Sequence, residues 1–154
     1  MILRRGITSF FDCDDLVSIP KFSNAEFKRI VYAAVAPMEY TVSNVTKRGI
    51  TPNFHSAMLS SDENVVSILG HSNYPIFAFT EPLGSNSRNV RFIDCEPLSQ
   101  QIVTLFPNAT VATAAELTQP LSNAHLNKLD AVELKQIKYW KPKTVGDVAF
   151  NWWD

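Results

Sequence analysis

The residues best suited to covalent chemistry are two cysteines and three histidines: Cys13, Cys95, His55, His71 and His125. A cysteine becomes a nucleophile when a nearby base lowers its pKa, so a cysteine–histidine pair would indicate a small cysteine-dependent hydrolase. The sequence lacks the local signatures of the cysteine hydrolase families. Cys95 ends an apolar, strand-like run, where an inert buried thiol is the commoner finding. We therefore predict two reduced cysteines and no catalytic residue, with the hydrolase kept as an alternative.

A metal site would have to combine His55, His71, Asp94 and Cys95. Their spacing matches neither a helical His-x-x-x-His pair nor a Cys-x-x-Cys knuckle. The glycines never cluster into a loop that would surround a phosphate group. The sequence therefore predicts no metal ion and no cofactor.

Five lysines lie near the end of the sequence, at Lys128, Lys135, Lys138, Lys141 and Lys143. Asp130 and Glu133 are mixed with them, which is typical of the solvated face of a helix. The whole chain has 14 basic and 15 acidic residues, with a net charge of −1. Direct nucleic-acid binding usually requires a basic surface, so we predict none. A nucleic-acid accessory protein is the second alternative.

The middle of the sequence is acidic. Between residues 51 and 127 the sequence has two basic residues, Arg88 and Arg91. The same segment has six acidic residues: Asp62, Glu63, Glu81, Asp94, Glu96 and Glu116. An acidic surface would steer a basic protein partner towards it, whereas the simpler interpretation is that carboxylates occupy turns because turns are solvated. Turns and proline-flanked strand ends should expose four of these side chains. The predicted partner-binding residues are Asp62, Glu63, Glu81 and Glu96.

Length and composition fit one domain over residues 1–154, since 45% of the residues are hydrophobic and 19% are charged. The start lacks the apolar run of a secretory signal. The longest apolar stretch near a helix, Ile30 to Met38, is too short to cross a bilayer. We therefore expect a cytoplasmic protein without membrane contact, as a monomer or a weak homo-oligomer.

Local patterns predict the elements that position these residues. A capping box from Ser23 to Glu26 begins a helix over about 24–36. Antiparallel strands are predicted near Tyr40–Val45, Phe54–Leu59, Val65–Leu69, Tyr74–Thr80 and Val90–Ile93. Helical spacing returns over Leu98–Phe106, over Asp130–Tyr139 and from Thr144, and Thr110–Thr113 is either a strand or a connection. The fold class is α+β, with a mainly antiparallel sheet of four or five strands packed against the N-terminal helix and two C-terminal helices.

All three tryptophans, Trp140, Trp152 and Trp153, fall within the last fifteen residues. Chain ends normally lose order, so this density of aromatic side chains predicts a C-terminal segment packed into the body of the protein. Phe150 and Trp152 should each bury a large area of about 150–250 Å², with Trp152 on the final helix.

The segment from Tyr139 to Asp154 reads YWKPKTVGDVAFNWWD. It resembles the closing signature, W-x-P-x-T-x-G-[DE]-x-x-F-N-x-W-D, of immunity proteins from bacterial polymorphic toxin systems, notably those of contact-dependent growth inhibition. The resemblance implies a non-catalytic cytoplasmic protein that neutralises a cognate toxin domain by occlusion. Toxin nucleases are commonly basic because they bind phosphate, so a nuclease is the toxin expected to meet the acidic residues. Within the signature we predict a structural role, in which Asn151 and Asp154 bond to backbone groups.

Overall fold

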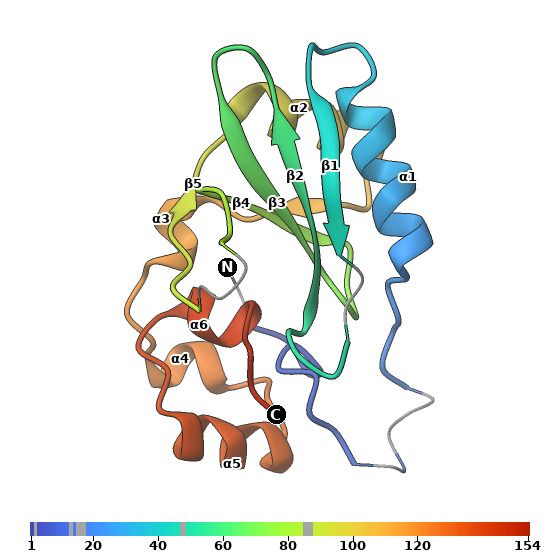
Figure 1. Ribbon diagram of the computed structural model, residues 1–154. Helices are drawn as coiled ribbons and strands as arrows, with labels where there is room; N and C mark the ends of the chain where they lie inside the picture. The colour runs from blue at the N-terminus through green and yellow to red at the C-terminus, as the bar shows by residue number, and fades with distance from the viewer. Residues whose placement is uncertain (2, 13, 15–17, 47–48, 85–87) are drawn as a thin grey trace.

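The computed structural model describes residues 1, 3–12, 14, 18–46, 49–84 and 88–154 (Figure 1). Six strands form one sheet: β1 (Thr41–Thr46), β2 (Phe54–Ser60), β3 (Val65–His71), β4 (Ile76–Thr80), β5 (Phe92–Ile93) and β6 (Thr110–Val111). The helices are α1 (Asn24–Val35), α2 (Glu96–Leu105), α3 (Ala114–Leu117), α4 (Asn123–Leu126), α5 (Ala131–Trp140) and α6 (Val145–Ala149). Within the described ranges, no helix combines the length and apolar character needed to cross a membrane.

The strands β1 to β5 follow one another in an antiparallel meander. The outer edge of β4 is shared by two short partners, because β5 pairs with its end and β6 pairs in parallel with its beginning. The α+β fold and the mainly antiparallel sheet are thus confirmed. The sheet is larger than the predicted four or five strands because Thr110 and Val111 form a strand and not merely a connection.

Helix α1 begins where the sequence predicts it, at a complete capping box. The Glu26 backbone N–H donates to Ser23 Oγ at 3.1 Å, and the Ser23 N–H donates to Glu26 Oε2 at 3.0 Å. The hydrogen bond from the Ser23 backbone lowers the pKa of the Glu26 carboxyl. Helices α3 and α4 were not predicted from the sequence, since each has only four residues and offers no helical period.

Helices cover both faces of the sheet, so the strands β3 and β4 are buried on both sides (Figure 1). On one face, Phe27 of α1 packs in a core with Ile68 and Phe77 of the sheet and with side chains of α2. A Cβ at Gly70 would lie 2.4 Å from the Phe27 ring, so any larger residue at this position would force that ring to move. On the other face, Leu69 packs in a second core that includes the N-terminal arm, α3 and α6.

Part of the C-terminal signature packs in this second core, through Val145, Val148, Ala149 and Phe150. Phe150 is buried, and the Asn151 N–H donates to Asn53 Oδ1 at 2.8 Å while the Asn53 N–H donates to Asn151 O at 3.0 Å. The prediction that Trp152 lies on the final helix is wrong, because α6 ends at Ala149. Asp154 is exposed, and it accepts no hydrogen bond in the described part of the chain, so its expected capping role is not observed.

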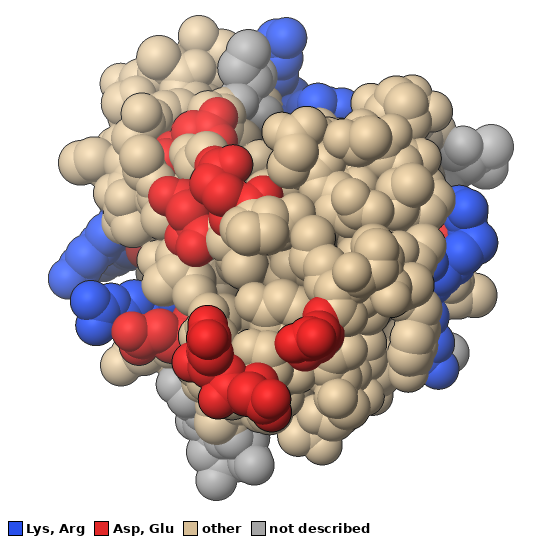
Figure 2. Space-filling view, turned by 90° about the horizontal axis from the view of Figure 1, so that it is seen from above, with Lys and Arg blue, Asp and Glu red and all other residues tan. Residues whose placement is uncertain are grey.

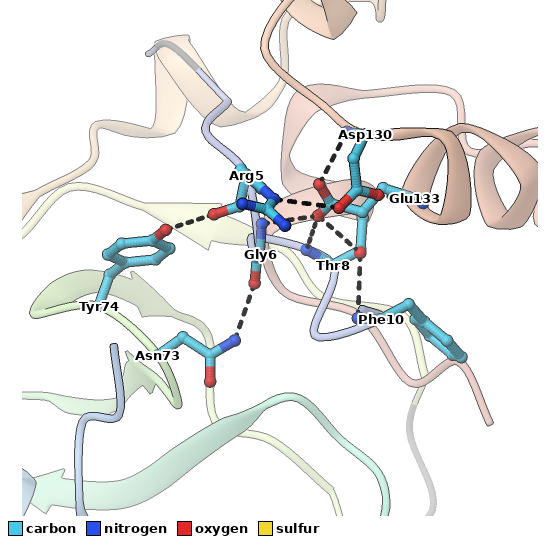
Figure 3. Close-up of polar contacts among 8 residues, drawn as sticks. All are labelled: Arg5, Gly6, Thr8, Phe10, Asn73, Tyr74, Asp130 and Glu133. Carbon is cyan, nitrogen blue, oxygen red and sulfur yellow. Dashed lines mark hydrogen bonds and ion pairs between the residues drawn. The ribbon is translucent and has the colours of Figure 1, made fainter. Parts of the chain in front are cut away.

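The N-terminal arm is fixed by a carboxylate of α5 that the sequence places on a solvated helix face (Figure 3). That prediction is wrong, since Glu133 is fully buried. Its Oε1 accepts hydrogen bonds from Gly6 N at 3.0 Å, from Thr8 N at 3.1 Å and from Thr8 Oγ1 at 2.8 Å. Gly6 adopts a φ of +84°, which turns the arm around the carboxylate. The sequence pattern misses this role because the donors lie more than a hundred residues away along the chain.

Candidate interaction surface

The turn between β2 and β3 places two carboxylates at one end of the sheet. The Ser61 N–H donates to Asn64 O at 2.8 Å, and the Asn64 N–H donates to Ser61 Oγ at 3.1 Å. These bonds fix the backbone that carries Asp62 and Glu63, whose side chains are exposed as predicted. The charges are therefore presented from an ordered turn and not from a loose loop.

The start of α2 meets the same end of the sheet. Tyr40 precedes β1, and its hydroxyl lies near the side chains of Cys95, Ser61 and Asn64, which all influence its pKa. Burial is the main cause that raises the pKa of Tyr40, and the neighbouring Cys95 adds to it. Because Cys95 is the N-cap of α2, these contacts bring Glu96 close to the β2–β3 turn.

The end of β4 completes this surface. Thr80 pairs with Ser67 near the beginning of β3, so Glu81 emerges on the same side as the turn. Glu81 is exposed and forms an ion pair with Arg91 at 3.3 Å. Both partners are largely solvated, so the pair is weak and the Glu81 charge is only partly neutralised.

We call this surface the acidic end, and its members are Glu39, Asp62, Glu63, Glu81, Asp94 and Glu96. Figure 2 looks down on this end and shows red carboxylates gathered over it, with blue basic side chains only at the rim. Apart from the Glu81–Arg91 contact, the carboxylates of the acidic end form no ion pair with a described residue. The Asp94 carboxylate also has a local role, since it accepts the Ala114 N–H at the start of α3.

The four predicted residues, Asp62, Glu63, Glu81 and Glu96, are thus brought to one end of the fold. Sequence reasoning missed Glu39, which lies outside the acidic middle segment. Because Thr41 of β1 pairs with Ser60 of β2, Glu39 lies at the same end of the sheet as the β2–β3 turn. The hairpin pattern indicates that β1 and β2 pair, but only their register shows that Glu39 lies beside the turn.

The residues considered for covalent or metal chemistry do not converge. Cys95 is buried, and burial raises the pKa of its thiol, which disfavours the thiolate that a hydrolase would need. His55 Nε2 lies 2.9 Å from Phe22 O, and His71 Nε2 lies 2.7 Å from Ile7 O, so both rings bond to backbone on opposite faces of the sheet. Within the described residues no three histidine, cysteine or acidic side chains are grouped as metal ligands. Cys13 lies outside the described residues.

We expect Cys95 to react with iodoacetamide at pH 8 at least about tenfold more slowly in the folded protein than in denaturant. Burial both raises the pKa of the thiol and covers the sulfur. A Cys13→Ser variant leaves one thiol, and mass spectrometry follows its alkylation over time. Equal rates in the two states would show that the Cys95 thiol is accessible, and would favour the hydrolase alternative.

No family model, no curated protein and no solved structure matches this chain. The functional interpretation therefore depends on the chemistry of the acidic end and on the terminal signature.

Proposed function

We propose that this protein is an immunity protein that binds a cognate toxin domain and neutralises it by occlusion, without turnover. The observation that carries the proposal is the acidic end, where exposed carboxylates from four separate segments gather and, apart from Glu81, form no ion pair with a residue that the structure describes. Unpaired like charges in one place repel one another, so their gathering is favoured when a partner of opposite charge covers them.

A nuclease domain is the partner that best fits this surface. Nucleases bind phosphate through basic side chains, and a carboxylate surface can occupy the same groups while excluding the nucleic acid. The ordered β2–β3 turn and the proline neighbours of Glu81 and Glu96 limit the entropy lost on binding. The same surface would repel a phosphate backbone, which makes the nucleic-acid accessory protein the weaker alternative.

The variant with Asp62→Lys, Glu63→Lys, Glu81→Lys and Glu96→Lys is expected to bind the toxin at least about thirtyfold more weakly than the wild type, which corresponds to about 2 kcal/mol. The loss should fall mainly on the association rate, and the dependence of affinity on salt should flatten. The toxin domain is sought in the reading frame next to the gene. Surface plasmon resonance at several salt concentrations measures both effects, after circular dichroism has shown that the variant is folded.

A pair of double variants separates a local effect from a change in net charge. Asp62→Lys with Glu63→Lys and Asp12→Lys with Asp154→Lys alter the net charge equally, and all four side chains are exposed. Only the first pair should weaken toxin binding. If both pairs act alike, or if the quadruple variant binds as the wild type does, the interface lies elsewhere and the lysine-bearing segment 128–143 becomes the next candidate.

A further inference from the structure

The C-terminal signature surrounds a groove of about 370 Å³ on the side of the fold formed by α5 and α6. All three tryptophans of the chain, Trp140, Trp152 and Trp153, line it. The rings of Trp140 and Trp153 lie parallel within 3°, with centroids 6.3 Å apart, and Trp152 packs edge-on against Phe54 at 4.9 Å. The three indoles are only partly buried, and Trp152 and Trp153 also pack against the second core.

Three cations border the same groove: Arg88, Lys141 and Lys143. None of them forms an ion pair with a described residue. The one carboxylate of the lining is Asp147, and one of its oxygens already accepts the N–H groups of Lys143 and Thr144, both at 3.0 Å. The groove therefore combines aromatic walls with an excess of unpaired positive charge, on a chain that is otherwise slightly acidic.

The groove also has hydrogen-bonding capacity that the described fold leaves unused. Trp140 Nε1–H donates to Gln136 Oε1 at 3.2 Å, whereas the indole N–H groups of Trp152 and Trp153 donate to no described residue. Neither of these two nitrogens is among the buried polar atoms of the described residues that lack a partner, so both N–H groups are open to solvent and accessible to a ligand. Two such donors beside three cations suit a ligand that carries several acceptor atoms and negative charge.

The backbone around the groove is fixed by local structure. Lys141 adopts a left-handed conformation with φ of 52°, and its N–H donates to Ile137 O at 2.9 Å to close α5. A Cβ at Gly146 would lie 2.4 Å from the Phe92 ring and 2.9 Å from Leu117 O, so α6 approaches its neighbours as closely as glycine permits. The groove is thus preformed, which lowers the entropy lost when a ligand binds.

We propose that this groove binds a mononucleotide, with the base against the indole rings and the phosphate held by Lys141, Lys143 and Arg88. Indole faces stack on any nucleobase, and basic side chains of this kind bind phosphate. The volume lies at the small end of the range for ligand sites, which fits one nucleotide better than a strand. The acidic end would also repel a long polyanion. This site is separate from the proposed toxin interface, and its existence does not depend on that proposal.

The tryptophan fluorescence of the protein, excited at the red edge where tyrosine hardly absorbs, reports on this groove, because the groove contains every tryptophan. Titration with AMP is expected to change the emission in a saturable way at millimolar or lower concentration. Adenosine and inorganic phosphate test the two halves of the ligand, and each should bind at least about tenfold more weakly than AMP. An oligoadenylate should bind no more tightly per site than AMP. Tighter binding of the oligomer, or equal binding of adenosine, would overturn the mononucleotide assignment.

The double variant Lys141→Glu with Lys143→Glu should raise the dissociation constant for AMP at least about tenfold. The matched control is Lys128→Glu with Lys135→Glu, which alters the net charge equally at exposed lysines outside the groove, and it should bind as the wild type does. If the wild type shows no saturable response to AMP, or if both double variants lose binding equally, the proposal is overturned. Circular dichroism checks that each variant is folded.

Discussion

Removal of residues 150–154 is expected to abolish cooperative unfolding, leaving a chain without a stable tertiary structure. The Phe150 side chain is buried, and its ring lies 6.0 Å from the rings of both Phe54 and Phe92. Loss of such a side chain costs about 3–5 kcal/mol, out of about 5–15 kcal/mol for the stability of a whole domain. The truncation also removes Asn151, whose backbone N–H and C=O bond to the buried Asn53 and whose side chain donates to Thr8 O and Val148 O. Thermal denaturation followed by circular dichroism measures the effect.

Removal of Asp154 alone provides the control, since this residue is exposed and should leave the melting temperature nearly unchanged. A chain lacking residues 150–154 that stayed folded but no longer bound toxin would assign the terminal signature to the interface instead of to the core.

The variant Glu133→Leu is expected to lose about 3–5 kcal/mol of unfolding free energy, because three buried donors lose their acceptor. The carboxylate is fully buried and accepts three hydrogen bonds from the N-terminal arm at Gly6 and Thr8. A leucine would leave those donors buried without partners, and each such donor costs about 1–3 kcal/mol. Urea denaturation at neutral pH measures the loss.

The variant Glu133→Gln separates the hydrogen bonds from the volume of the side chain. Its amide oxygen can still accept from the arm, so it should lose less free energy than Glu133→Leu. Lys135→Leu on the exposed face of α5 is the control for a change in helix composition. If Glu133→Leu unfolds at the same urea concentration as the wild type, the arm is held by other contacts.

The parts of the fold that the sequence predicts well are those with local causes. The capping box at Ser23 begins α1, and the strands of the meander follow from their short apolar runs. The local pattern predicts a solvated face for Glu133, because the donors that it accepts from lie at the opposite end of the chain. Such long-range hydrogen bonds have no signature in the local pattern of residues.

The candidate surface was predicted only in part, for a similar reason. Exposure of Asp62 and Glu63 follows from a turn pattern, which is local. The meeting of that turn with Glu39 and with Cys95 depends on the register of β1 and on the position of α2, which the sequence leaves open. The sequence does not predict the groove, because a dense run of aromatic side chains near a chain end indicates core packing and carries no sign of a surface hollow.

The most direct test of the proposed function is a titration of the toxin's enzymatic activity with this protein. We expect the purified protein to form a complex with the toxin domain encoded beside it and to abolish the activity once the two are equimolar, because occlusion consumes one inhibitor for each toxin molecule. The quadruple lysine variant of the acidic end should shift that titration to large excess. Complete protection at amounts far below equimolar would instead indicate catalytic turnover, and the absence of any complex would contradict the immunity function itself.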